Sequence, residues 1–179
     1  MAKTKSRRYR RRSGRWAPNI VKISSTNQAT TGEWFNAEEL VTNPTNTSSG
    51  ISQSFTVKNF EINFTIETEG LSSSNALESI TAYIMFVPQG MTVSSSYYAD
   101  HPEYILAYKF LGSPNSPYFT VTSSSTTKYE RQQYQPYRIK TRMSRRLQTG
   151  DKIILYIQGS NQDVTQNYNI DGLVRWRKS

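Results

Sequence analysis

Apolar and polar residues alternate along several segments of this chain, and this alternation restricts its fold more than any other feature. In residues 60–67 every second residue is large and apolar, namely Phe60, Ile62, Phe64 and Ile66. Side chains of a β-strand point alternately to opposite faces of a sheet, so this pattern predicts a strand with one buried face.

Three other segments predict strands just as clearly. Residues 79–87 are apolar almost throughout and end at Pro88-Gln89-Gly90, as in a strand that is buried on both faces. Residues 152–158 lie between two glycine-containing turns, and residues 170–177 alternate again. Weaker strand patterns occupy residues 19–25, 104–111, 117–123 and 136–144.

The segments between these strands are rich in Pro, Gly, Ser, Thr and Asn, which favour turns and loops. Only residues 35–41 and the neighbourhood of Ala76–Ser79 have a composition that suits a helical turn or two. About eight strands without a long helix predict an all-β fold, either a two-sheet sandwich or a barrel. We expect one such domain over residues 17–179.

The first sixteen residues differ from this domain in charge. Residues 1–15 carry eight Lys or Arg side chains and no acid. The whole chain has 22 bases and 13 acids, and nine of the bases precede residue 23, so the remainder balances 13 bases (22 − 9) against 13 acids. A dense block of like charge with few apolar residues has nothing to bury, so we expect residues 1–16 to be a disordered basic arm.

The partner expected for such an arm is a nucleic acid, because each neutralised phosphate releases condensed counterions whatever the base sequence. Arginine can grip a phosphate with two hydrogen bonds, and a tyrosine within the run can stack on an unpaired base. A nuclear-localisation signal and a solvated tail without a partner are the alternatives. No apolar face or lipidation signal favours a membrane. The predicted contacts are Lys3, Lys5, Arg7, Arg8, Tyr9, Arg10, Arg11, Arg12, Arg15 and Lys22.

A second basic cluster lies in residues 131–150, which contain six bases and no acid. Arg138, Lys140 and Arg142 are spaced by two, so in a strand they share one face. Like charges in register repel one another unless an anion lies opposite, which favours an anion-binding surface over an ordinary solvated face. The same surface would include Arg145 and Arg146 at the end of the strand, and Arg175 and Arg177 if the last strand joins the same sheet.

The residues required for catalysis are scarce. The chain has no cysteine and a single histidine, His101, which we expect to be a turn or interface residue. No phosphate-binding loop of the GxxxxGK type and no nucleophile elbow occur. Glu38 and Glu39 are expected to be solvated, with calcium ligation between subunits as the alternative. We therefore expect neither an enzyme nor a bound cofactor or metal.

Tyrosines are frequent in the weakly charged loops. Such surfaces favour protein–protein contact, although these side chains can also simply cover the ends of a sandwich. The residues concerned are Tyr97, Tyr98, Tyr118, Tyr134, Tyr137 and Tyr168.

Four features together resemble the capsid proteins of circular Rep-encoding single-stranded DNA viruses, the circovirus-like group. They are the Arg-rich arm, residues 83–90 (YIMFVPQG), residues 101–107 (HPEYILA), and residues 142–156 (RMSRRLQTGDKIILY). The resemblance covers the arm and residues 55–179. A coat protein of a satellite or small RNA virus, and a cellular RNA-binding β-domain with a basic tail, are the alternative classes.

The resemblance implies a single eight-stranded jelly roll with sheets B-I-D-G and C-H-E-F. It also implies a T=1 icosahedral shell of sixty copies around circular single-stranded DNA, a location in the virion and the host nucleus, and host nuclear import machinery as a further partner. Strands B to I are assigned in order to residues 19–25, 55–67, 79–87, 104–111, 117–123, 136–146, 151–158 and 169–177. Strands G and I then share the inward-facing sheet, although a simple hairpin over 136–158 is a rival local topology.

Overall fold

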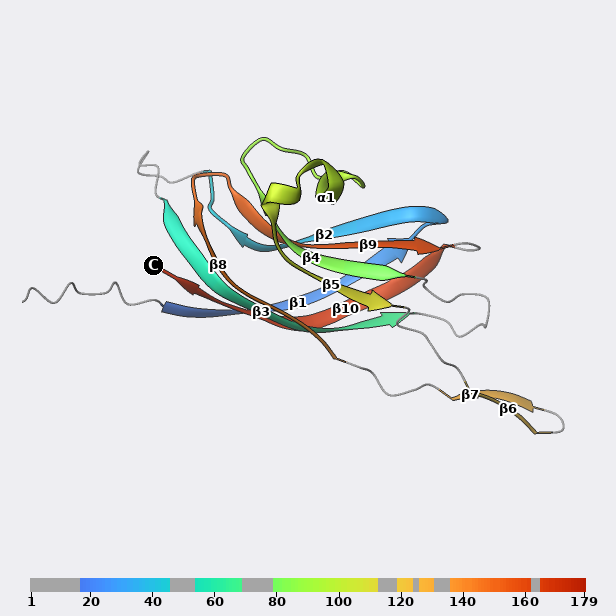
Figure 1. Ribbon diagram of the computed structural model, residues 1–179. Helices are drawn as coiled ribbons and strands as arrows, with labels where there is room; N and C mark the ends of the chain where they lie inside the picture. The colour runs from blue at the N-terminus through green and yellow to red at the C-terminus, as the bar shows by residue number, and fades with distance from the viewer. Residues whose placement is uncertain are drawn as a thin grey trace, which may run out of the picture.

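Two four-stranded antiparallel sheets face each other in the computed structural model (Figure 1), which describes residues 17–45, 54–68, 79–112, 119–123, 126–130, 136–161 and 165–179. The first sheet has the order β1 (Ala17–Ala29), β10 (Gln166–Lys178), β3 (Phe55–Thr68) and β8 (Tyr137–Leu147). The second has the order β2 (Gly32–Thr42), β9 (Lys152–Asn161), β4 (Ile80–Val87) and β5 (Ile105–Gly112). A separate hairpin joins β6 (Phe119–Ser123) to β7 (Thr126–Glu130).

The strand order is that of a jelly roll. With β1, β2, β3, β4, β5, β8, β9 and β10 taken as strands B to I, the two sheets read B-I-D-G and C-H-E-F. The expected fold class, an eight-stranded β-sandwich, is confirmed. The rival hairpin over 136–158 does not form, since β8 pairs with β3 whereas β9 pairs with β2 and β4.

Four of the individual strand assignments were wrong. Residues 35–41, expected to form a helical turn, belong to β2, which is therefore strand C. Residues 55–67, 79–87 and 104–111 consequently move one letter on, to strands D, E and F. The segment 117–123 contributes β6 to the separate hairpin, and so it is not strand F.

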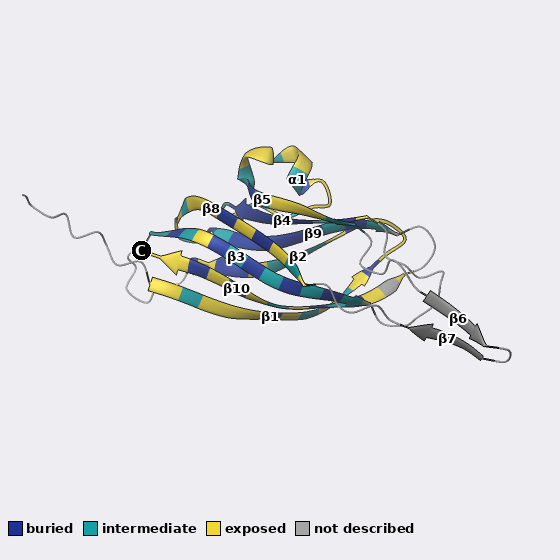
Figure 2. Ribbon diagram, turned by 60° about the horizontal axis from the view of Figure 1, so that its bottom comes forward, coloured by how far each residue is buried: buried dark blue, intermediate teal, exposed yellow. Residues whose placement is uncertain are grey.

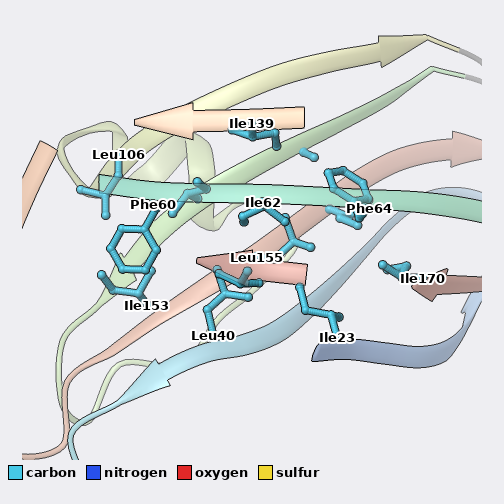
Figure 3. Close-up of a cluster of buried hydrophobic side chains, with 14 of the residues drawn as sticks. Ile23, Leu40, Phe60, Ile62, Phe64, Leu106, Ile139, Ile153, Leu155 and Ile170 are labelled. Atoms are coloured by element: carbon cyan, nitrogen blue, oxygen red, sulfur yellow. The ribbon is translucent and has the colours of Figure 1, made fainter. Parts of the chain in front are cut away.

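The core between the sheets comes from the alternation along β3. Phe60, Ile62 and Phe64 point inward toward Ile153 and Leu155 of β9, as Figure 3 shows, while the intervening residues of β3 face outward. Burying one of these side chains fully contributes roughly 1.5–3 kcal/mol, so this layer supplies most of the force that holds the sheets together.

The connection between β4 and β5 covers the outer face of the second sheet. It holds α1 (Tyr97–Asp100) and η1 (Pro102–Tyr104), which lie over this sheet in Figure 1. Met85, Ile154 and Tyr156 form a second small core beneath it with Tyr97, which is 1% exposed. The hydroxyl of Tyr97 donates to the Phe86 carbonyl oxygen at 3.0 Å, so this connection is tied to β4.

Two of the loop tyrosines expected at a contact surface, Tyr97 and Tyr168, are instead buried within the subunit. Burial raises the pKa of Tyr97 to about 12 and raises that of Tyr168 as well. Both side chains therefore stay neutral and contribute to packing rather than to contact with another protein. Tyr118 and Tyr134 lie outside the described residues.

Three turns at one end of the sandwich are tied together by Asp151, which is 7% exposed. Its Oδ1 accepts a hydrogen bond from the Gln89 amide at 3.0 Å, and its Oδ2 accepts one from the Gln148 amide at 2.8 Å. The Asn43 amide donates to the Asp151 carbonyl at 2.9 Å. The ends of β4 and β8 thereby share one buried carboxylate, and the end of β2 is held by the backbone carbonyl of the same residue.

Replacing Asp151 with Ala should lower the free energy of unfolding by about 2–3 kcal/mol, because two partly buried amides lose a charged acceptor. Urea titration of the full chain, followed by the fluorescence of the buried Trp34 and Trp176, measures the change. The matched control is Glu33→Ala, which removes an exposed carboxylate. Equal stability of the two variants would show that the turns at Gln89 and Gln148 do not depend on the Asp151 side chain.

Candidate nucleic-acid interface

The outer face of the β1-β10-β3-β8 sheet is basic, and none of the described residues covers it. Figure 2 turns this sheet toward the viewer and shows buried and half-buried positions alternating along β3. Because neighbouring residues in register share a face, the pairing fixes which side chains meet there. We call the following set the basic face: Lys22, Arg138, Lys140, Arg142, Arg175 and Arg177, all of them exposed.

Strand register places these bases in rows across the sheet. One row runs from Lys22 through Leu173 and Asn63 to Arg138. The next runs from Ile20 through Arg175 and Glu61 to Lys140. Adjacent strands lie about 4.8 Å apart, so a row of four strands is about 14 Å wide. The bases are therefore close enough to contact several phosphates of one nucleic-acid strand.

A carboxylate stands in the middle of the basic face. Oε1 of Glu61 lies 2.8 Å from Nη2 of Arg138 and accepts a hydrogen bond from Nδ2 of Asn63 at 3.4 Å. The Asn63 hydrogen bond, with the charges of Arg138 and Lys140, holds the pKa of Glu61 below its ordinary value of 4.5. Glu61 is thus ionised at neutral pH, and it offsets part of the repulsion between its basic neighbours.

An open groove of about 460 Å³ crosses the basic face beside Glu61. Four bases line it, and Pro18 and Ile20 of β1 line it as well; the bases are Lys140, Arg142, Arg175 and Arg177. Four positive charges against one carboxylate give the groove a net charge of +3. A groove of this size and charge suits a phosphorylated ligand.

The groove lies where two irregularities of the sheet meet. The register shifts between Arg175 and Arg177 against one side of β3, and between Lys58 and Phe60 against the other. Asn59, between them, has φ of 56°, a left-handed conformation that Asn tolerates better than most residues. Bulges bend a strand and increase its twist, so the two irregularities together bend the sheet and make its outer surface concave at this point.

Other predicted contacts lie elsewhere. Arg145 shares the core side of its sheet with Val57, and its guanidinium lies 3.9 Å from the centre of the Phe86 ring. Arg146 donates to the Ser54 hydroxyl from Nε at 3.0 Å and from Nη2 at 2.7 Å. The predicted contacts from Lys3 to Arg15 lie outside the described residues, and the chain that carries them continues into β1 beside the groove at Pro18.

Sequence reasoning missed Ile20, Asn59 and Glu61 as parts of this surface. The signal for Asn59 was present, since the buried residues Val57 and Phe60 are three apart rather than two. Such a break in the alternation indicates a bulge. Ile20 is 62% exposed, and its place beside four bases follows only from the pairing of β1 with β10.

The single histidine and the acid Glu39, which the sequence singled out, make contacts within the fold. Nδ1 of His101 lies 3.5 Å from Oε1 of Glu103, and its ring stacks on Tyr104 with the ring centres 5.2 Å apart. Glu39 pairs with Lys152. The described ranges hold no cluster of three His, Cys, Asp or Glu residues suited to a metal ion. Their helices are also too short and too polar to cross a membrane.

No family model matches this chain, and no curated protein matches it either. Solved structures that align with this chain include the VP2 subviral particle of infectious bursal disease virus, with 9% identity over 89% of this chain and a TM-score of 0.36. Desmodium yellow mottle tymovirus is another, with 12% identity, 90% of this chain and 88% of the other covered, and a TM-score of 0.31. This chain spans 32% of the VP2 chain.

Removing charge from the groove should weaken nucleic-acid binding in a salt-dependent way. For Arg175→Ala with Lys140→Ala we expect the slope of log K against log salt to fall by about 0.7 per lost phosphate contact on a single strand. The control is Lys109→Ala, an exposed base on β5 of the other sheet. Fluorescence anisotropy with an oligonucleotide at several salt concentrations measures the slope, and equal slopes for both variants would exclude the groove.

Arg145→Ala should behave differently, because its guanidinium lies over an aromatic ring. We expect a loss of about 1 kcal/mol in the free energy of unfolding, from the cation–π contact with Phe86. Affinity for the oligonucleotide should stay within about twofold, which corresponds to roughly 0.4 kcal/mol. A large loss of affinity at unchanged stability would place Arg145 among the nucleic-acid contacts instead.

Proposed function

We propose that this chain is a viral capsid protein that assembles into a closed shell and packages nucleic acid. The observation that carries the proposal is that the outer face of one sheet is covered and the outer face of the other is exposed and basic. The β4–β5 connection covers the second sheet, whereas the described residues leave the basic face of the first sheet exposed, and β1 of that sheet follows directly on the basic arm. The jelly-roll strand order supports a coat-protein role, since many viral capsid domains have this architecture.

In this arrangement the basic face and the arm line the interior of the shell. A face with several bases and one central acid binds a polyanion chiefly through phosphate charge, so packaging needs no particular genome sequence. With the T=1 shell that the circovirus-like resemblance implies, sixty copies of +9 supply roughly 540 charges, a substantial part of a kilobase-scale genome.

The finer parts of the proposal rest on the same resemblance. They are circular single-stranded DNA as the genome, the host nucleus as a site of replication, and nuclear import through the arm. A coat protein of a satellite or RNA virus would use the same phosphate contacts. We propose no catalytic activity and no cofactor for the chain.

Open sheet edges are consistent with assembly. The strands β1, β8, β2 and β5 each lie at an edge of their sheet. Such edges have unpaired backbone groups that must be covered or used in contacts with other chains. On β5, Tyr108 and Phe110 are 69% and 63% exposed, which adds apolar area at one of these edges.

Deleting residues 1–16 should leave the sandwich folded, because β1 begins at Ala17. We expect the variant to form shells or smaller oligomers whose nucleic-acid content is sharply reduced, since about eight bases per copy are lost. Negative-stain electron microscopy and the ratio of absorbance at 260 and 280 nm measure the two effects. Unchanged nucleic-acid content would contradict packaging by the arm.

The full-length chain is the control, and it also tests the proposal as a whole. A capsid protein forms particles of uniform size. A cellular RNA-binding domain with a basic tail would remain small at every concentration. Size-exclusion chromatography of the full chain distinguishes the two, and a strictly monomeric protein would exclude the capsid role.

A further inference from the structure

We propose that the groove on the basic face binds one nucleotide of a single strand and that Glu61 selects bases that carry an amino group. The inference rests on the proposed nucleic-acid role and deepens it. Glu61 is the acid that lines the groove among four bases, and a carboxylate at that place acts on a nucleotide in two opposite ways.

First, Glu61 repels phosphate from the centre of the groove. Its ionised carboxylate leaves Arg142, Arg175 and Arg177 as the favourable positions for the sugar–phosphate backbone. Arginine binds phosphate oxygens with a planar fork of donors, so these side chains suit that task. The backbone is therefore directed away from Glu61, and the base is left to occupy the space next to it.

Second, Glu61 can accept hydrogen bonds from a base. Its ion pair with Arg138 and its hydrogen bond from Asn63 both involve Oε1. An ionised carboxylate has about four acceptor positions over its two oxygens. Oε2 thus retains acceptor capacity toward a ligand in the groove, while Arg138 and Asn63 hold the group in place.

The edges of the bases differ in what they offer to a carboxylate. Cytosine, adenine and guanine each present an exocyclic amino group, and a carboxylate is the usual acceptor for that of cytosine. Thymine presents carbonyl oxygens on both sides of its ring N–H, and these repel a carboxylate. Single-stranded bases expose these edges, whereas a duplex hides them, so the selection applies to single strands.

The apolar part of the groove completes the site. Pro18 and Ile20 line it from β1, and Ile20 pairs in register with Arg175, which pairs in turn with Glu61. A base lying over this row has an apolar side chain and a guanidinium to stack on, with the carboxylate at its far edge. Stacking tolerates any base, so the preference comes from Glu61.

The test compares oligo-dC with oligo-dT of equal length on the full-length chain. The arm binds both through phosphate, so the ratio of the two dissociation constants reports the groove. We expect the native chain to favour oligo-dC, and Glu61→Gln to reduce that ratio by about tenfold or more, the usual worth of a hydrogen bond to a charged group. Glutamine keeps the shape but adds an amide donor that can pair with a thymine carbonyl.

Three results have distinct meanings. A ratio that falls in Glu61→Gln but not in the control Glu67→Gln, an acid further along β3, supports the selection. An equal ratio in the native chain and Glu61→Gln overturns it, even though shells and overall binding persist. A full chain that neither assembles nor binds either oligonucleotide overturns the proposed function itself.

Discussion

The burial of one face of β3 between the two sheets determines the rest of the molecule. Phe60, Ile62 and Phe64 pack against β9, and a strand with a period of two must then turn Glu61 and Asn63 to the outside. Residues paired in register share a face, so Arg175 of β10 and Arg138 and Lys140 of β8 also face outward beside Glu61 and Asn63. The composition of the basic face is thus a consequence of what the core buries.

The bulge at Asn59 shows how sensitive that relation is. A slip of one residue moves every later side chain of a strand to the other face. Across the irregularity the buried residues of β3 change from Phe60 to Val57, and Lys58 pairs with Ser144. Strand β8 keeps its alternation, so Arg145 faces the core side with Ile139 and Leu147 and lies over Phe86. The irregularity in β3 helps to form the groove beside the bases.

Sequence reasoning identified most of the strands. It predicted β3, β4, β9 and β10 from clear patterns and β1, β5, β6 and β8 from weaker ones, and it placed Arg138, Lys140 and Arg142 on one face. It missed β2, because Ala37, Glu38 and Leu40 favour helices in isolation and only pairing with β9 makes this segment extended. The same omission displaced the letters of β3, β4 and β5 by one, whereas β8, β9 and β10 received the correct letters because 117–123 was counted as a strand of the sandwich.

The site was predictable in its charge but not in its shape. Basic residues at alternate positions are visible in the sequence, whereas the pairing of β1 with β10 and of β10 with β3 joins segments more than 100 residues apart. Ile20 and Glu61 become neighbours of Arg175 only through these long-range pairs. Local pattern carries no information about such contacts, and the groove they form could not be foreseen.

Charge separation within the body explains why the arm need not act alone. The four strands of the first sheet carry ten bases and three acids, a net of +7, whereas the four strands of the second carry two bases and three acids, a net of −1. A domain whose charges cancel in the sequence is therefore polarised in space. Charge on one face attracts a polyanion at distances up to about 10 Å at moderate salt, even when the total is near zero. The arm extends the positive charge beyond the domain, on which the basic face of the first sheet already attracts a polyanion.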